Sequence, residues 1–368
     1  MKISVPREEL LDAVNKVKSV VSAKSALPIL SHILMETQES AVRLTATDLK
    51  VSIECTVDCS VEEAGSLTVS SQRLSSILSE LPPGDIRLAL GDNNVIGLES
   101  GRTETKLFSM APDEFPPVRS FENVEPLVLE QSVLKKLFMK TSFAICSDQA
   151  RYNLTGLLCE IGGGKLTTVA TDGRRMTLAV QEEGIPDGID MKVIIPGKMI
   201  VELERLLADE GEVNVFISES QAGFAFDSMR LVTALIEGNF PDYDMVVPKK
   251  HDKEAVLDTP AFVEAVRRTR TMTNEKFNSV RFQLESGNMV LRVVTPEVGE
   301  YKEDMPIEYE GESIEIAFNP NFILDVLRHI ESDKCCFVLK DPTSPGVIKP
   351  YTEGGADTYV NVIMPIRI

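Results

Sequence analysis

Two carboxylates that end similar strand-like stretches are the residues of this chain best placed for chemistry. Asp48 closes the stretch 42–48, and Asp172 closes the closely similar stretch 166–172. Repeated carboxylates of this kind could hold a divalent metal for hydrolysis. An Asp at the end of a strand more often orders the turn that follows, because its side chain accepts hydrogen bonds from nearby backbone N–H groups. A third stretch, 290–295, is followed by Pro296 rather than Asp, which favours the turn interpretation.

Other catalytic chemistry has less support. The chain contains only three histidines, His32, His251 and His329, and none has a second histidine at the spacing that zinc sites use. The run Gly162–Lys165 resembles the end of a phosphate-binding loop, but Leu166 stands where Ser or Thr would bind the metal, so a hairpin turn is the better interpretation. We therefore identify no constellation of residues that would be catalytic, and we predict no metal site and no cofactor.

The composition is that of a folded chain that does not enter membranes. Hydrophobic residues make up 43% and charged residues 26% of the 368 residues, and no apolar run approaches the ~20 residues of a membrane span. The first ten residues lack the apolar segment of a secretion signal. The cysteines are scattered without a CxxC pair, which predicts reduced, mostly buried thiols and a cytoplasmic location. They are Cys55, Cys59, Cys146, Cys159, Cys335 and Cys336.

The chain repeats itself three times. Thr47, Thr171 and Thr295 end similar strand-like stretches at equal spacing, and each is followed at a similar distance by a strand that turns into an amphipathic helix. The pairs Phe115-Pro116 and Phe240-Pro241 close the first two repeats. Several markers in one order at one spacing indicate tandem domains. We predict three, with boundaries at 1–120, 127–246 and 247–368.

Each repeat combines two helices with about eight strands. Apolar residues recur at helical spacing in six segments, 7–20, 71–81, 131–146, 198–210, 259–276 and 320–333, while the runs between them alternate as strands do. Thr259-Pro260 and Asn319-Pro320 are typical of a helix N-cap followed by Pro in the first turn. This predicts an α+β fold of three tandem similar domains, with helices on one face of antiparallel sheets.

The charge is distributed unevenly. The net charge of −19 argues against a nucleic-acid partner. The six helical segments are close to neutral in sum, however, so nearly all of the excess acid lies in strands and loops. Lys135, Lys136 and Lys140 share one solvent face of a helix, and Arg267, Arg268 and Arg270 are similarly grouped. If the helices form one surface, that surface could touch phosphates without gripping them.

Several motifs resemble those of one family along the whole chain. They are Met1–Ile3, Leu27–Leu30, Ala170–Arg175, Phe240–Tyr243, Asn274–Phe277 and the tail Met364–Ile368. Together with the three repeats, they are similar to the bacterial sliding clamp, the beta subunit of DNA polymerase III. The resemblance implies the DNA clamp fold, with helices lining the inside, antiparallel sheets outside and a head-to-tail dimer that forms a closed ring.

The resemblance also implies a non-catalytic function, that of an accessory subunit of the DNA polymerase III holoenzyme rather than an enzyme, and its partners. It implies a DNA polymerase processivity factor that encircles double-stranded DNA without sequence preference and tethers replicative and repair polymerases through a peptide-binding pocket. Further implied partners are a clamp loader and other proteins that carry clamp-binding peptides, and the loaded protein would lie with the bacterial nucleoid. A near-neutral lining would permit sliding, because retention would come from ring closure.

The resemblance places three groups of site residues. The peptide pocket falls on Leu154, Thr171, Gly173, Arg174, Arg175, Met176, Pro241, Val246, Val362, Met364, Pro365 and Arg367. Arg174 stands where the family often has His, and Met245 where a basic residue is common. The candidates for DNA contact are Lys24, Arg73, Lys135, Lys136, Lys140, Tyr152 and Lys198. The dimer interface falls on Leu107 and Met272.

Two alternatives from other classes remain open at this point. One is a metal-dependent hydrolase that uses Asp48 and Asp172. The other is an acidic scaffold of the same fold without a role on DNA. Turnover with a metal requirement would distinguish the first, and retention on circular but not linear DNA would exclude the second.

Overall fold

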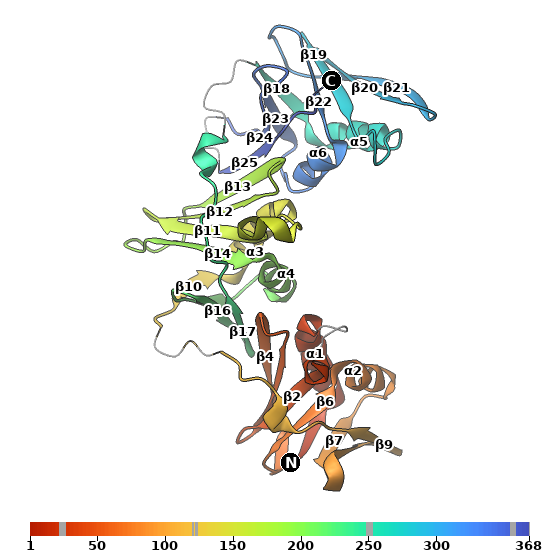
Figure 1. The fold of residues 1–368 in the computed structure, drawn as a ribbon, viewed down its shortest axis with the longest axis vertical. Helices are drawn as coiled ribbons and strands as arrows, with labels where there is room; N and C mark the ends of the chain where they lie inside the picture. Colours follow the sequence, from red (N-terminus) through yellow and green to blue (C-terminus); the bar gives the residue numbers. More distant parts are fainter. Residues whose placement is uncertain (22–26, 120, 122–123, 248–252, 354–357, 368) are drawn as a thin grey trace. The chain divides into compact units, whose positions relative to one another are not determined.

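The chain forms two compact units. The computed structural model of the chain describes residues 1–21, 27–119, 121, 124–247, 253–353 and 358–367 (Figure 1). Unit 1 comprises Met1–Lys135 and Lys198–Leu235, and unit 2 comprises Lys136–Gly197 and Ile236–Ile368. Neither unit coincides with one sequence repeat, for a reason that the sheets make clear.

Two sheets build unit 1. The smaller has the strand order β5 (Ser60–Glu63), β1 (Lys2–Pro6), β7 (Asp85–Leu90), β8 (Val95–Ser100) and β9 (Thr103–Phe108). The larger, sheet B, has the order β10 (Leu127–Glu130), β15 (Glu212–Ile217), β16 (Gln221–Phe226), β17 (Met229–Ala234), β4 (Val51–Asp58), β3 (Ala41–Thr47), β2 (His32–Thr37) and β6 (Ser66–Ser70). Its first four strands come from the second repeat and its last four from the first.

Unit 2 is built in the same way. Its larger sheet, sheet C, has the order β14 (Met191–Pro196), β11 (Gly156–Gly162), β12 (Lys165–Thr171), β13 (Arg175–Gln181), β25 (Tyr359–Ile363), β24 (Gly346–Pro350), β23 (Lys334–Leu339) and β18 (Lys253–Asp258). The smaller has the order β21 (Gly299–Pro306), β20 (Asn288–Thr295), β19 (Val280–Glu285) and β22 (Ile314–Phe318). Sheet C joins the second repeat to the third, and the compact units cut across the repeats because hydrogen-bonded ladders connect neighbouring repeats.

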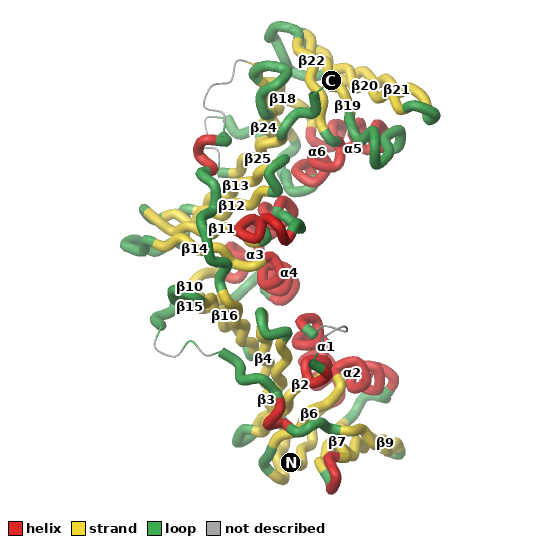
Figure 2. Tube along the Cα trace, viewed as in Figure 1, coloured by secondary structure: helices red, strands yellow, loops and turns green. Residues whose placement is uncertain are grey.

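Six α-helices occur among the described residues, two in each repeat, where the apolar spacing predicts them. They are α1 (Arg7–Val17), α2 (Ser71–Glu80), α3 (Gln131–Thr141), α4 (Gly197–Leu206), α5 (Thr259–Arg270) and α6 (Pro320–Leu327). In unit 1, α1 packs against α2 and against β3 and β4, and in unit 2, α5 packs against α6 (Figure 2). The helices are shorter than predicted, because single 3₁₀ turns or loops replace the last turn of several predicted segments.

Local signals explain where the helices begin. Asn319 caps α6 with its side chain and Pro320 occupies the first turn, as the sequence predicts. The predicted cap at Thr259 is one residue late, because the Asp258 carboxylate accepts the hydrogen bond from the Ala261 N–H and Thr259 is already helical. Asp is as good a cap as Thr, and the sequence offers both in succession.

Two smaller predictions are confirmed. Gly163 and Gly164 both adopt positive φ between β11 and β12, which is the two-residue hairpin expected in place of a phosphate-binding loop. The six cysteines are all free thiols, five of them buried. Burial raises the pKa of the Cys159 thiol to about 12, which keeps it protonated. Within the described ranges, we find no helix with the length and apolar character that crossing a membrane requires.

Candidate functional site

An apolar cavity of about 690 Å³ opens in unit 2. It is lined by Leu154, Thr171, Gly173, Arg174, Arg175, Met176, Phe240, Pro241, Tyr243, Met245, Val246, Lys340, Ser344, Pro345, Val362 and Met364. We call it the unit 2 cavity. Its residues come from the second repeat, the third repeat and the C-terminal tail, and they converge because sheet C joins these segments.

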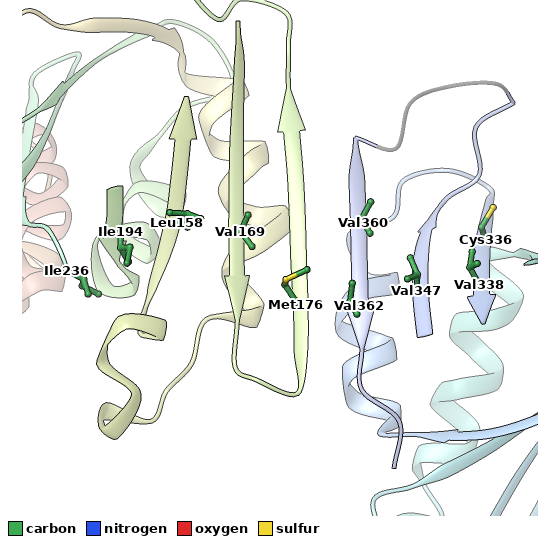
Figure 3. Close-up of a cluster of buried hydrophobic side chains, with 10 residues drawn as sticks. All are labelled: Leu158, Val169, Met176, Ile194, Ile236, Cys336, Val338, Val347, Val360 and Val362. Carbon is green, nitrogen blue, oxygen red and sulfur yellow. The ribbon is translucent and has the colours of Figure 1, made fainter. Parts of the chain in front are cut away.

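The floor of this cavity is the seam between β13 and β25. Met176 lies directly opposite Val362 across the antiparallel pair, and both are almost fully buried. Figure 3 shows these two side chains at the junction of the strands, with Val169 and Leu158 on one side and Val347 and Val338 on the other. The cluster extends under the cavity, so the floor is dry and apolar and suits an apolar ligand.

One wall is the turn from Asp172 to Arg175. The Asp172 carboxylate accepts hydrogen bonds from the N–H groups of Arg174 and Arg175 at 2.9 and 3.0 Å. Gly173 has a φ of +80°, which a side chain would strain. The Thr171 hydroxyl donates to the Arg175 carbonyl at 2.7 Å. These bonds fix the backbone of the turn, and with it the positions from which the two arginine side chains start.

The two arginines of this turn have different environments. The Arg175 guanidinium donates to the Asp325 carboxylate at 2.6 Å and to the Phe143 carbonyl at 2.7 Å, and it stacks over Phe322 at 4.6 Å. It is thus engaged by the protein itself and connects the turn to α6. Arg174 is exposed, and its backbone carbonyl accepts a hydrogen bond from the Met364 N–H at 2.8 Å. Since its side chain has no ion-pair partner among the described residues, Arg174 is the arginine that can meet a ligand.

The opposite wall is the chain between the second and third repeats. The Tyr243 hydroxyl donates to Glu160 at 3.1 Å. Burial and the neighbouring Glu160 carboxylate raise the pKa of Tyr243 to about 12, so the hydroxyl remains a donor near neutral pH. Met245 is 81% exposed at the rim, and Val246 and Met364 are also exposed. Exposed apolar side chains gathered around an apolar cavity are typical of a partner site.

The cavity brings together most of the predicted pocket residues. All of them line it except Pro365 and Arg367, which lie in the tail just beyond Met364. Five further lining residues were not predicted from the sequence: Phe240, Tyr243, Lys340, Ser344 and Pro345. Phe240 and Tyr243 belong to the Phe-Pro marker and could have been included. The segment 340–345 carries no motif that would mark it as part of a site. It reaches the cavity only through the pairing of β23, β24 and β25, which has no local sequence signal.

The predicted DNA-contact residues lie on or near the helices. Arg73 is exposed on α2, Lys136 is exposed on α3, and Tyr152 is half-exposed. Three of the lysines already have partners. Lys135 pairs with Asp209 at 2.7 Å, Lys198 pairs with Asp48 at 2.6 Å, and Lys140 lies 5.5 Å from the Tyr359 ring. Lys24 lies outside the described residues.

The predicted interface residues lie at sheet edges. Leu107 belongs to β9, which ends the smaller sheet of unit 1, and Phe108 beside it is 80% exposed. Met272 follows α5, and its Cε lies 3.5 Å from where a Cβ would stand on Gly299, the first residue of β21. β21 in turn ends the smaller sheet of unit 2. Each predicted interface residue thus lies on or beside a terminal strand of its sheet.

Asp48 and Asp172 order the turns that follow their strands, as the turn interpretation of these residues predicts. Asp48 accepts hydrogen bonds from the N–H groups of Lys50 and Val51, matching what Asp172 does in the second repeat. Among the described residues, no three His, Cys, Asp or Glu side chains are close enough together to hold a metal ion. The carboxylates that suggested a hydrolase are therefore accounted for by backbone turns.

Comparison with known proteins identifies the fold and its class. The family described as DNA polymerase III beta subunit matches in three parts, its N-terminal domain over residues 1–119, its central domain over 128–242 and its C-terminal domain over 244–367. Curated relatives named "Beta sliding clamp" include those of Pseudomonas putida, 34% identical over the full length of both chains, and Chlamydia muridarum, 32% identical over all of this chain and 99% of the relative.

Solved structures of sliding clamps have the same fold as this chain. The sliding clamp of Pseudomonas aeruginosa bound to griselimycin has a TM-score of 0.95 at 33% identity, and that of Bacillus subtilis has a TM-score of 0.96 at 26% identity. The first match covers both chains fully, and the second covers all of this chain and 99% of the other. Fold and site thus define a polymerase sliding clamp built from three tandem domains.

The chain belongs to the DNA polymerase III beta subunit family. It is a DNA polymerase processivity clamp and not an enzyme, and the hydrolase alternative has no support. DNA and polymerase are its partners in general terms, and it dimerises as the family does.

Proposed function

We propose that the unit 2 cavity binds short linear peptides of polymerases, of the clamp loader and of other clients. The observation that supports this most directly is an apolar cavity beside the β13–β25 seam with Arg174 at its edge. An extended peptide with an apolar end would pack against Met176, Val362 and Met364. One Gln in the peptide would bond backbone groups at the rim. Few polar groups around an apolar floor give such a peptide its orientation.

We also propose a head-to-tail dimer in which β9 of one subunit pairs with β21 of the other. The internal seams of sheets B and C supply the argument. β17, the counterpart of β9 in the second repeat, pairs with β4, and β25, its counterpart in the third, pairs with β13. β21 is the counterpart of β4 and β13, yet it ends its sheet, as β9 ends its own. An unpaired edge on each strand is satisfied if two subunits meet there.

The same comparison gives the register of the proposed seam. Ser52 opposes Val232 in sheet B, and Met176 opposes Val362 in sheet C. Counting from the hairpins that precede these strands places Lys106 opposite Gly299 and Leu107 opposite Val298. Val298 is exposed, and Met272 lies against Gly299. Leu107 would then lie directly beside Val298 of the partner subunit, with Met272 of the partner subunit beside the neighbouring position, Gly299. Two such contacts close a ring, since a head-to-tail contact either closes or makes a filament.

The dimer test places Asp at both Leu107 and Met272. Burying unpaired like charges at one seam costs several kcal/mol, so the variant should be monomeric in sedimentation. Leu49→Asp is the matched control, because Leu49 is exposed on the β3–β4 turn, away from both edges. Dimers of the double variant that persist at micromolar concentration would show that the interface lies elsewhere.

We propose that the ring encircles duplex DNA with its helices inside and its sheets outside. Most of the basic helix residues are paired with carboxylates, as Lys135 with Asp209, Arg267 with Glu264 and Arg268 with Glu303. Such a lining would hold DNA weakly, and retention would be topological. The candidates for contact remain Lys24, Arg73, Lys135, Lys136, Lys140, Tyr152 and Lys198, and domain boundaries of 1–120, 127–246 and 247–368 remain a proposal.

Retention on circular DNA tests the whole proposal. Clamps placed on a nicked circle by a clamp loader should remain through gel filtration and should be lost once the circle is cut. Binding to linear duplex should be weak and should fall with salt, since counterion release governs phosphate contacts. Equal retention on both forms would favour the acidic scaffold over the clamp. In cells, the protein should be cytoplasmic and should join the nucleoid when loaded.

A further inference from the structure

A second cavity, of about 390 Å³, lies wholly within unit 1 and is polar where the unit 2 cavity is apolar. We call it the unit 1 cavity. Its floor is sheet B, and its roof is the chain that leaves the first repeat, including Pro112 and Phe115. Phe115 is buried in a small cluster with Ile29 and Leu30, which fixes the roof over the sheet.

The strand register defines the floor. Thr45 of β3 lies opposite Glu54 of β4, and Glu54 lies opposite Arg230 of β17, so these three side chains form a row across one face of the sheet. Directly opposed side chains in a sheet stand about 5 Å apart at Cβ. Arg43, two residues before Thr45 on the same face, pairs with Glu36 at 2.7 Å. All of these residues line the unit 1 cavity.

Two groups at the centre of this floor are buried without a partner. The Thr45 hydroxyl and the Arg43 Nε–H make no hydrogen bond with any described residue, and Thr45 is only 1% exposed. Buried donors in folded proteins are almost always paired with protein or with bound molecules. Both groups can donate, so what they lack is an acceptor, and an oxygen atom of a ligand would supply it.

The charged side chains beside these donors indicate which charges the ligand must carry. Among the described residues, neither Glu54 nor Arg230 takes part in an ion pair, and the Arg230 guanidinium is held over the Phe121 ring at 4.1 Å. A plain anion placed on Thr45 would meet the Glu54 carboxylate. A plain cation would meet Arg43 and Arg230. A molecule with both charges satisfies all of these groups, while the proline and phenylalanine rings of the roof offer apolar contact.

We propose that the unit 1 cavity binds a small zwitterion, an α-amino acid with an apolar side chain. Its carboxylate accepts hydrogen bonds from Thr45 and Arg43 and faces Arg230. Its ammonium group faces Glu54, and its side chain lies against Pro112 and Phe115. Charge-assisted bonds of this kind are stronger than neutral ones. This site is separate from the unit 2 cavity and does not depend on peptide binding there.

The test uses the full-length protein and three matched probes. Saturation-transfer NMR should detect L-leucine at about 10 mM, a concentration suited to weak ligands. N-acetyl-leucine lacks the ammonium group and leucinamide lacks the carboxylate, so each should bind at least about tenfold more weakly if a charge-assisted bond is lost. Inorganic phosphate is the fourth probe. Binding of phosphate without binding of leucine would overturn the proposal in favour of a plain anion site.

Variants separate this cavity from the rest of the protein. Thr45→Val keeps the shape of the strand residue and removes the hydroxyl, so leucine affinity should fall about threefold to tenfold, as expected for one lost hydrogen bond. Thr167→Val is the control, since Thr167 is a half-buried strand residue of unit 2. Both variants should bind a client peptide as the native protein does. Absence of leucine binding, or equal leucine binding by Thr45→Val, would overturn the proposal.

Discussion

The two eight-stranded sheets present the same row of positions with opposite chemistry. In sheet B the row runs Leu34, Thr45, Glu54 and Arg230. In sheet C the strand pairing places Leu158, Val169, Leu178 and Val360 at the corresponding positions. We call these two sets the polar row and the apolar row. In both sheets the chain that connects two repeats runs over this face.

The rows decide what the connecting chain can do. Phe240 and Tyr243 pack on the apolar row and fill it, and the unit 2 cavity opens beside it, over Met176 and Val362. Apolar side chains packed on the polar row would bury the Thr45 hydroxyl and the Glu54 carboxylate without hydrogen-bond partners. The space over this row therefore remains a cavity. One scaffold thus carries a dry floor for a peptide in one unit and a charged cavity in the other, through a few side-chain differences.

The largest effect should come from removing the tail that completes the apolar site. Deletion of Met364–Ile368 should weaken a client peptide roughly thirtyfold, because a central apolar anchor contributes about 2 kcal/mol or more. Met364→Ala alone should account for much of this loss. Fluorescence polarisation of a labelled peptide gives the affinity, and sedimentation of the same variants should show intact dimers.

Met245→Ala is the matched control for the tail. Met245 is also an exposed methionine of the unit 2 cavity, but it lies at the rim and is far more exposed than Met364. Contacts at a rim contribute little, so its peptide affinity should change less than about threefold. Unchanged affinity in a folded, dimeric tail deletion would place the peptide elsewhere.

Exchanging the central residues of the two rows should have unequal effects. Val169→Thr puts a hydroxyl into the apolar row, where it has no partner, and should lower the free energy of local opening by about 1–3 kcal/mol. Thr45→Val removes a buried hydroxyl that is already unpaired, so it should not lower stability and should raise it by up to about 1–3 kcal/mol. Hydrogen exchange of the β12 and β3 amides measures each unit separately. Equal destabilisation by both changes would contradict the difference between the rows.

The fold could be predicted because its signals are local. Apolar spacing identified all six helices, and the repeated Thr47, Thr171 and Thr295 marked equivalent strands. The hairpin at Gly163 and the turn role of Asp172 followed from residue type alone.

The sites could be predicted only in part, because sheet pairing across repeats has no local signal. Leu178 meets Val360 and Glu54 meets Arg230 through seams that join residues far apart in the chain. Without those seams, Thr45 and Arg43 read as ordinary strand residues. For the same reason, the Arg175 side chain could be predicted near the pocket but not its ion pair with Asp325.

Lysine substitutions at the two arginines of the pocket turn should affect peptide affinity and thermal stability differently, because only Arg175 is bonded to other parts of the protein. Arg175→Lys keeps the charge but cannot bond Asp172, Asp325 and the Phe143 carbonyl together, since lysine lacks the planar fork. Because the turn loses its anchor to α6, peptide affinity should fall about threefold to tenfold and the midpoint of thermal unfolding should fall with it. Arg174→Lys should leave thermal unfolding unchanged. Loss of thermal stability in Arg174→Lys but not in Arg175→Lys would reverse these assignments.

The smallest expected effect compares the equivalent turns at Asp48 and Asp172. Asp48 is partly buried, which by itself would raise its pKa, but hydrogen bonds from the Lys198 ammonium and from the N–H groups of Val51 and Lys50 outweigh burial, and the pKa is lowered. A carboxyl with a lowered pKa in the folded protein stabilises the fold above its ordinary pKa, near 4, and this contribution is lost as the pH falls through the lowered value.

Asp48→Asn cannot lose a charge on acidification. Its midpoint of thermal unfolding should therefore be lower than that of the native protein at pH 7, and the drop between about pH 5 and about pH 2.5, where the native carboxyl takes up its proton, should be smaller by about 1–2 °C. Asp85→Asn is the control, since Asp85 is exposed at the end of β7 and makes no side-chain hydrogen bond or ion pair with the described residues. It should show the native drop, and a native drop in Asp48→Asn as well would mean that Lys198 does not hold this turn in solution.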